Sequence, residues 1–351
     1  MPSASDPPLP PLPSRDPTGH KGTFGTVAVV GGNATADARM IGAPALCAAA
    51  ALRAGAGLVR LVTPEPILSA ALTLIPSATG RGLAVHTAGE HSHDLIPHEA
   101  AAVLDDLLRE CDAMVIGPGL GHASGAQAAT LRALQNERVP VVADADALNC
   151  LALIPEFTRE LRAHAILTPH PGEFRRLCDS MGLPGHLGLA ADRASACQQL
   201  AQRLGGCVIV LKGAGTVVSD GARTWTHQFA DSVLATAGTG DVLSGIIAAL
   251  VSQFVPRRSD AQAAIDSLSG VPADVLQRMR QAVSARDAAN DPASRSPALS
   301  LFDAARLGVV VHARAAQHWR HAHHDADAGL LALELASCIP HAMRSLRRPH
   351  P

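Results

Sequence analysis

The stretch Ala113-Met114-Val115-Ile116-Gly117-Pro118-Gly119-Leu120-Gly121 joins a short apolar run to a turn of alternating glycines, and the helical stretch Ala126–Leu134 follows it. A continuous apolar run that ends in such a turn predicts a strand buried on both faces. The same pattern recurs along the chain. We predict further strands at Thr26–Val30, Leu58–Val62, Val139–Val142, Ala165–Leu167, Val208–Leu211 and Thr216–Val218.

Segments rich in alanine and leucine separate most of these strands, notably Ala43–Ala54, Ala190–Leu204 and Asp241–Val251. Buried strands that alternate with helices predict an α/β fold in three layers, with a mostly parallel central sheet covered by helices on both faces. Leu301–Ala316 and Leu330–Ala336 are predicted as helices that complete one face.

Residues 20–340 are predicted to form one domain of the 351-residue chain. Prolines crowd residues 1–19, which predicts an extended, unpacked and disordered tail. The segment Pro256–Ser300 is rich in Asp, Ser, Arg, Ala and Pro, so we predict a partly helical or flexible insertion at about 256–300. Residues 341–351 are predicted as a C-terminal tail.

Composition narrows the class of protein. The net charge is −2 and basic residues form no run longer than a pair, which argues against a nucleic-acid surface. Seven scattered cysteines without a Cys-x-x-Cys pair indicate reduced, buried thiols in a cytoplasmic protein. The first residues lack the features of a signal peptide, and Arg53 with several glycines interrupts the apolar run Ile41–Val59, so we expect no membrane span.

Polar and glycine-rich turns follow five of the predicted strands. In an open parallel sheet, ligands gather at the carboxyl ends of the strands, so we expect these turns to meet at one edge of the sheet. They are Gly31-Gly32-Asn33, Gly117–Gly121, Asp144-Ala145-Asp146, Thr168–Glu173 and Lys212-Gly213.

The turn Gly238-Thr239-Gly240-Asp241 stands directly before an apolar helical stretch. Glycine lets the backbone approach an anion, and the amides of a first helical turn point at it. The helix terminus should also keep Asp241 ionised, so that its carboxylate accepts a proton from a substrate hydroxyl during phosphoryl transfer. The alternative is a plain helix cap, which does not need a glycine on each side of Thr239.

Lys212 ends an apolar strand and precedes Gly213, Ala214, Gly215 and Thr216. A lysine at this edge can meet a phosphate, which predicts a nucleotide contact; the alternative is an exposed lysine at the end of a strand.

Two further turns carry candidates. His170 stands between two prolines and is predicted to contact substrate, whereas Pro171 and Glu173 are expected to start the next helix. Asp144 and Asp146 are predicted either to hold a Mg²⁺ ion that accompanies a nucleotide or to cap the short helix after them.

Together these motifs resemble, in order and spacing, the ADP- or ATP-dependent NAD(P)H-hydrate dehydratases of the ribokinase-like superfamily. The resemblance covers about residues 18–340 apart from the insertion. The matching stretches are His20–Asn33, Gly42–Pro64, Val115–Gly121, Val141–Asn149, Ile166–Leu177, Val210–Thr216, Ala235–Leu250, Gly308–Ala316 and Gly329–Ile339.

The resemblance implies a ribokinase-like α/β/α sandwich and a carbon–oxygen lyase that repairs hydrated NADH or NADPH, in its S epimer, while ADP is hydrolysed to AMP and phosphate. It favours ADP, with ATP as the alternative co-substrate, and it implies Mg²⁺, a homotetramer and a separate epimerase protein. Asp241 would be the base that faces the hydroxyl of the hydrate. The implied nucleotide contacts are Lys212–Thr216 and Gly238–Gly240; the implied substrate contacts are Ala43, Gly119, Gly121, His170 and Asp241.

The chain departs from the family pattern at three places. A Gly-Asn type of turn is replaced by Phe229-Ala230-Asp231-Ser232-Val233, Ala237 stands where many members have glycine, and only a short tail stands where many bacterial members carry an epimerase domain.

Three other functions compete with this one. A small-molecule kinase acting on a vitamin-precursor alcohol would share the Gly238–Asp241 turn. A dinucleotide dehydrogenase would use the glycines of Gly117–Gly121 with Asp144, although their spacing differs from the usual fingerprint. A non-catalytic nucleotide sensor would have no need of Lys212 and Asp241.

Overall fold

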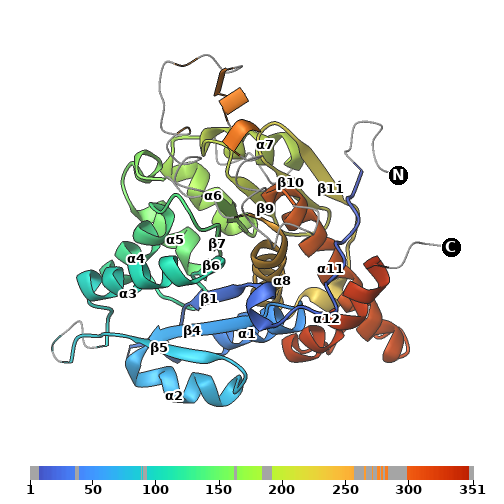
Figure 1. The fold of residues 1–351 in the computed structure, drawn as a ribbon, viewed down its shortest axis with the longest axis horizontal. Coiled ribbons are helices and arrows are strands. Elements are labelled where there is room, and N and C mark those ends of the chain that lie inside the picture. The colour runs from blue at the N-terminus through green and yellow to red at the C-terminus, as the bar shows by residue number, and fades with distance from the viewer. Residues whose placement is uncertain are drawn as a thin grey trace.

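A nine-stranded sheet lies between two layers of helices in the computed structural model (Figure 1). The structure describes residues 8–35, 39–87, 89, 93–161, 164–183, 192–256 and 299–347, with a few isolated positions between 265 and 283. The strand order is β11-β10-β9-β8-β7-β6-β1-β4-β5. The strands span Thr26–Val30 (β1), Leu58–Pro64 (β4), Thr79–Leu83 (β5), Ala113–Ile116 (β6), Val141–Ala143 (β7), Ala165–Leu167 (β8), Val208–Leu211 (β9), Thr216–Ser219 (β10) and Thr224–His227 (β11).

The predicted mostly parallel sheet is confirmed. Neighbouring strands from β9 to β5 run parallel, whereas β10 and β11 pair antiparallel at one edge. Residues 212–215 alone connect β9 to β10, and so short a connection permits a hairpin but not the crossover that a parallel pair needs. A separate two-stranded hairpin joins Asn33–Ala34 (β2) to Arg39–Met40 (β3).

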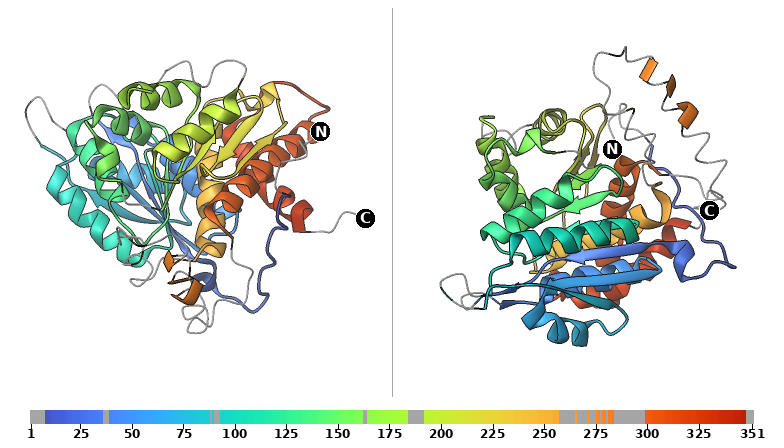
Figure 2. Two further views of the ribbon diagram at one scale, coloured as in Figure 1. Left: turned by 90° about the horizontal axis from the view of Figure 1, so that it is seen from above. Right: turned by 60° about the vertical axis from the view of Figure 1, so that its left-hand side comes forward.

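Helices cover both faces of the sheet (Figure 2). One layer holds α1 (Gly42–Arg53), α8 (Thr239–Phe254), α11 (Leu301–Ala322) and α12 (Ala332–Arg347). The other holds α3 (Pro97–Glu110), α4 (Ser124–Leu134), α5 (Asp146–Leu153), α6 (Pro171–Ser180) and α7 (Arg193–Arg203), and α2 (Glu65–Leu74) packs on β4 and β5.

Alternate residues of the strands supply the two cores. Val27 and Val29 of β1 enter the core beneath α1 and α8, whereas Ala28 and Val30 enter the core on the opposite face. Small residues let the helices approach closely: a Cβ at Gly245 of α8 would lie 2.2 Å from the carbonyl oxygen of Cys47 in α1. This contact explains why α8 carries glycine in its interior.

Both ends of the domain differ from expectation. The prediction of an unpacked tail is wrong for residues 8–19: Leu12 is 4% exposed, and the Arg15 guanidinium donates to the carbonyl of Gly55 and to the side chain of Gln253. Residues that flank prolines can still bury an apolar side chain, which a compositional argument overlooks. Helix α12 continues to Arg347, so the predicted C-terminal tail starts too early, while most of the predicted insertion lies outside the described residues.

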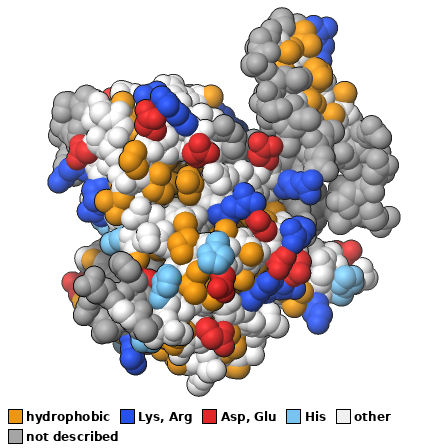
Figure 3. All heavy atoms as spheres, turned by 90° about the vertical axis from the view of Figure 1, so that its left-hand side faces the viewer, with side chains coloured by type: hydrophobic (Ala, Val, Ile, Leu, Met, Phe, Trp, Pro, Cys, Tyr) orange, Lys and Arg blue, Asp and Glu red, His pale blue; other side chains and the backbone are white. Residues whose placement is uncertain are grey.

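The cysteines and the charged surface residues lie as the composition of the chain predicts. Six of the seven cysteines are buried and all seven are free thiols. Acidic and basic side chains alternate over the face shown in Figure 3, with small apolar patches between them. Among the described residues, no helix combines the length and the apolar character that crossing a membrane requires.

Candidate active site

The five predicted turns meet at one edge of the sheet. They follow β1, β6, β7, β8 and β9, which are direct neighbours in the order β9-β8-β7-β6-β1 and run parallel. Helix α8 begins at the same edge, since a Cβ at Gly240 would lie 3.5 Å from the Lys212 Nζ. The structure therefore brings the Gly238–Asp241 turn to the polar turns, as expected.

The first turn of α8 is built to face an anion. Gly238 precedes the helix with φ 89°, and a Cβ there would lie 2.6 Å from Leu46 Cδ1, so both the conformation and the space require glycine. Within the described part of the chain, no acceptor takes the amide hydrogens of Gly240 and Asp241. Free amides at a helix N-terminus are the groups that bind phosphate.

The Asp241 carboxylate lies in this first turn and has no hydrogen-bond partner among the described residues. Burial raises the pKa of Asp241 to about 7, helped by Asp144 and opposed by Lys212. We expected the helix terminus to keep this group ionised, but desolvation and neighbouring carboxylates outweigh that effect. A carboxylate with a pKa near neutrality is suited to accept and release a proton.

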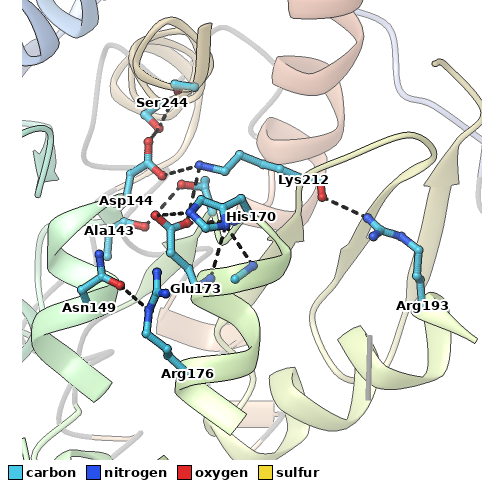
Figure 4. A network of polar contacts seen from close by, with 12 residues as sticks. Ala143, Asp144, Asn149, His170, Glu173, Arg176, Arg193, Lys212 and Ser244 are labelled. Atoms are coloured by element: carbon cyan, nitrogen blue, oxygen red, sulfur yellow. Dashed lines mark hydrogen bonds and ion pairs between the residues drawn. The ribbon is translucent and has the colours of Figure 1, made fainter. Parts of the chain in front are cut away.

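A chain of polar contacts joins α8 to residues at the ends of the strands (Figure 4). The Lys212 Nζ donates to Asp144 Oδ1 at 2.8 Å, and the Ser244 Oγ donates to Asp144 Oδ2 at 2.6 Å. Asp144 itself is 1% exposed. One buried carboxylate thus connects β7, β9 and α8.

Lys212 stays a cation in this setting. Burial lowers the pKa of its ammonium, but Asp144, Glu173 and Asp241 outweigh burial and raise it overall. The end of β9 is held as well, because Arg193 Nη2 donates to the carbonyls of Leu211 and Lys212 at 3.1 and 3.0 Å. The ammonium is therefore charged and fixed beside the start of α8.

Asp146 faces a different part of the edge. Its Oδ2 accepts from the amide of Gly121 at 2.8 Å, and its Oδ1 lies 2.8 Å from His122 Nε2. Neither carboxylate caps α5, whose N-cap residue Ala145 has no side-chain cap bond. Each of the two carboxylates is held by its own protein partners, and no group of three potential metal ligands occurs among the described residues, so the magnesium role stays a prediction.

His170 and Glu173 form a capping box at the start of α6. The Nδ1 of His170 accepts from the amides of Gly172 and Glu173, and the Glu173 carboxylate accepts from the amide of His170 at 2.8 Å. Pro171 and Glu173 were expected to start this helix, and the structure adds the imidazole of His170 as its N-cap. Burial, with Lys212 and Arg176, lowers the pKa of His170, so the ring is neutral and free to accept at Nδ1.

Glu173 has a second feature that the sequence argument missed. It is 4% exposed, its Oε2 lies 3.8 Å from the Lys212 Nζ, and burial raises its pKa to about 7.

Ser244 and Arg193 were also missed as members of the site. Ser244 follows Gly240 by one helical turn, a spacing that would have placed both on the same face of the helix.

Three of the residues that the resemblance assigns to the dinucleotide, Ala43, Gly119 and Gly121, lie together. A Cβ at Gly119 would lie 2.1 Å from Met40 Cγ and 3.5 Å from the Cβ of Ala43, and one at Gly121 would lie 2.3 Å from Asn33 Nδ2. Both glycines have positive φ, 63° and 79°. Met40, which is 43% exposed, was not anticipated here, because β2 and β3 are too short to leave a periodic pattern.

The unusual turn Phe229–Val233 has its own supports. The carbonyl of Phe229 accepts from the amide of Gly215 at 3.2 Å, which ties the turn to the predicted nucleotide loop. Asp231 accepts from the amide of Val233 and from Arg320 Nη1 at 2.9 Å. An ion pair to α11 therefore holds this turn.

Sequence comparisons point to one group of proteins. A family model described as NAD(P)H-hydrate dehydratase matches residues 27–292. The ADP-dependent (S)-NAD(P)H-hydrate dehydratase of Neisseria meningitidis serogroup B is 38% identical over 266 residues, which cover 74% of this chain and 79% of that protein. The bifunctional NAD(P)H-hydrate repair enzyme Nnr of Salinibacter ruber is 39% identical over 258 residues, 72% of this chain and 44% of that protein. The chain thus spans about half the length of such bifunctional relatives.

Structural comparison agrees with this. The ADP/ATP-dependent NAD(P)H-hydrate dehydratase from Bacillus subtilis, co-crystallised with ATP and Mg²⁺, has a TM-score of 0.65 and 26% identity, covering 96% of this chain and 95% of that one. The hypothetical protein SMU.573 from Streptococcus mutans, with a TM-score of 0.68 and 22% identity, shares the fold.

Proposed function

Since the chain belongs to the NAD(P)H-hydrate dehydratase family, we propose that it converts the S epimer of hydrated NADH or NADPH to the reduced dinucleotide while ADP becomes AMP and phosphate. One observation carries the proposal. The Asp241 carboxylate has no partner among the described residues, has a pKa of about 7, and adjoins the free amides of α8 and the Lys212 ammonium.

The chemistry proceeds in two steps. The hydroxyl oxygen of the hydrate forms a bond to the terminal phosphorus of ADP, the bond from that phosphorus to AMP breaks, and Asp241 takes the hydroxyl proton. The carbon–oxygen bond then breaks with phosphate as the leaving group, and the neighbouring carbon loses a proton, which the departing phosphate takes up, so that the double bond of the ring is restored. Asp241 returns its proton to solvent, so the balance is one hydrate and one ADP to one reduced dinucleotide, AMP, hydrogen phosphate and one proton.

The chain's own groups supply the electrostatics of the first step. The amides of Gly240 and Asp241 and the Lys212 ammonium would share the negative charge of the phosphoryl group as it passes between the two substrates. The Gly213–Thr216 loop would hold the nucleotide, and Ala43, Gly119, Gly121 and His170 the dinucleotide. A Mg²⁺ ion that enters with the nucleotide would neutralise phosphate charge. We assign it to neither Asp144 nor Asp146, because each carboxylate is engaged by its own protein partners.

The kinase alternative shares the first step and differs in the second. A kinase would release the phosphorylated alcohol, whereas a dehydratase expels phosphate from it. The geometry at Asp241 suits the transfer in both cases, and the family membership favours elimination. A separate epimerase, a homotetramer and a cytoplasmic location stay predictions.

Incubation with (S)-hydrated NADH and ADP tests the proposal. We expect the absorbance of the reduced nicotinamide to return in step with equal amounts of AMP and phosphate. A stable phosphorylated hydrate without recovered absorbance would instead support the kinase. Parallel reactions with ATP and with hydrated NADPH would establish the preferred co-substrate and dinucleotide.

A further inference from the structure

Asp144 is the most fully engaged carboxylate of the site. Its side chain is 2% exposed, its Oδ1 holds the Lys212 ammonium, and its Oδ2 holds the Ser244 hydroxyl. Burying a carboxylate is costly unless charged and hydrogen-bonding partners compensate for the lost water. The partners here compensate so well that the pKa of Asp144 is lowered despite complete burial.

These partners come from distant parts of the chain. Lys212 follows Asp144 by 68 residues and Ser244 follows it by 100, so the contact joins the end of β9 to the second turn of α8 across β7. Lys212 and the first turn of α8 are the two groups that face the phosphoryl group in the proposed function. Figure 4 shows Asp144 in contact with both Lys212 and Ser244.

We propose that Asp144 is a positioning residue that holds the Lys212 ammonium and the start of α8 in one fixed arrangement for phosphoryl transfer. The proposal rests on the proposed function for the reaction, but the contact itself exists without any substrate. It replaces the magnesium role predicted for Asp144. A divalent ion on this carboxylate would have to displace an ammonium that lies 2.8 Å from one oxygen and a hydroxyl that lies 2.6 Å from the other.

The composition of the chain offers a direct readout, because Lys21 and Lys212 are its only lysines. Lys21 is exposed in the first turn of the domain and serves as an internal reference. We would acylate the folded protein with acetic anhydride at mildly alkaline pH and measure by mass spectrometry the modification rate of Lys212 relative to Lys21. An ammonium bound to Asp144 is protonated and therefore protected.

Asp144→Asn is the principal variant. We expect relative acylation of Lys212 to rise at least about tenfold, because a one-unit fall in the pKa of an amine raises its reactive fraction about tenfold. We expect kcat to fall about 100-fold, as for other losses of preorganised transition-state contacts, while KM for ADP and the Mg²⁺ concentration at half-maximal rate change by less than about threefold. Asp105→Asn is the matched control: it removes a carboxylate of α3 that pairs with Arg132 of α4 and should alter none of these values.

Ser244→Ala removes the link to α8 alone. We expect kcat to fall about fivefold with relative acylation of Lys212 unchanged, because Asp144 Oδ1 still holds the ammonium. If Asp144→Asn does not fold, Ser244→Ala keeps the proposal testable through the same separation of kcat from lysine protection.

Three outcomes would overturn the proposal. Unchanged protection of Lys212 in Asp144→Asn would show that the contact does not hold the lysine. A rise of tenfold or more in the Mg²⁺ requirement, with kcat recovered at saturating Mg²⁺, would make Asp144 a metal ligand. Full kcat in both variants would make the contact irrelevant to transfer. If the wild-type protein turned over no hydrate, the proposed function would fail, and the acylation arm would still decide whether Asp144 holds Lys212.

Discussion

The imidazole Nε2 of His312 lies 2.8 Å from the carbonyl oxygen of Thr239, the first residue of α8. Burial lowers the pKa of His312 to about 4, with Lys212 acting in the same direction and the bond to Thr239 opposing them. The ring is therefore neutral near neutral pH and donates from Nε2. His312 of helix α11 thus supports the turn that carries Asp241.

The pH dependence of stability should report this histidine. Its pKa in the folded chain is below its unfolded value of about 6.5, so the unfolded chain binds the extra proton first. The contribution is fully present above about pH 6.5 and is lost as the pH falls toward 4. Chemical unfolding measured between pH 4 and 7 should show a smaller loss for His312→Gln than for the wild type, and an equal loss would refute the assignment. His312→Ala should also cost about 1–2 kcal/mol near neutral pH through the unpaired Thr239 carbonyl.

Asp241→Asn should abolish dehydration while ADP still binds, because an amide cannot accept the hydroxyl proton. In the wild type, the rate should rise with pH through about 7, the pKa of Asp241, since only the ionised carboxylate acts as a base. Absorbance recovery measured from pH 5.5 to 8.5 gives the profile, and calorimetry gives ADP binding. Near-full turnover in the variant, or a rate independent of pH below 7, would mean that another group is the base.

His170→Asn separates two roles of one side chain. Asparagine is a good N-cap residue, so the unfolding free energy should change little, whereas His170→Ala should lose about 1 kcal/mol. If the imidazole also contacts the hydrate, both variants should raise KM for the hydrate, by severalfold or more, with KM for ADP unchanged. An unchanged KM for the hydrate in His170→Asn would leave His170 with the capping role alone.

Gly119→Ala should impair binding of the hydrate and spare that of the nucleotide. The added methyl would meet the Met40 side chain at 2.1 Å, and φ of 63° is unfavourable for alanine. We expect KM for the hydrate to rise at least about tenfold and ADP binding to stay within about twofold. The double variant Gly119→Ala/Met40→Ala removes the collision, and its partial recovery would locate the cause at Met40.

Local sequence was enough to predict the inner strands. Thr26–Val30, Ala113–Ile116 and Ala165–Leu167 were predicted with their observed ends, because a strand buried on both faces is an uninterrupted apolar run. Edge strands leave a weaker trace: two glycines interrupt β5, and β11 alternates threonine with large rings. Thr216–Val218 was found, but its antiparallel direction follows from the connection length rather than from its composition.

A site residue could be predicted where a local sequence motif indicates its chemistry. It could not be predicted where its role depends on a contact with a residue far away in the sequence. Asp241 and Lys212 stand in recognisable turns. The role of Asp144 depends on residues 68 and 100 positions away, and that of His312 on a carbonyl 73 positions away. Such pairings can be recognised only when the order of the strands in the sheet is known. The pKa of Asp241 was misjudged for the same reason. The helix terminus that lowers this pKa is visible in the local sequence, whereas the carboxylates that raise it come from distant residues.

The close contact of α1 with α8 at Gly245 bears on the distance between the reacting groups. Ala43 stands at the start of α1, and Asp241 at the start of α8. The atoms closest to a Cβ at Gly245 belong to the backbone of Cys47 and Ala51 and to the methyl group of Ala50, so nothing longer than a methyl group separates the two helices there. Transfer requires the attacking oxygen and the phosphorus to meet within a few tenths of an ångström of a productive separation. In the proposed function, the packing of α1 on α8 would therefore set the distance between a dinucleotide held at Ala43 and the carboxylate of Asp241.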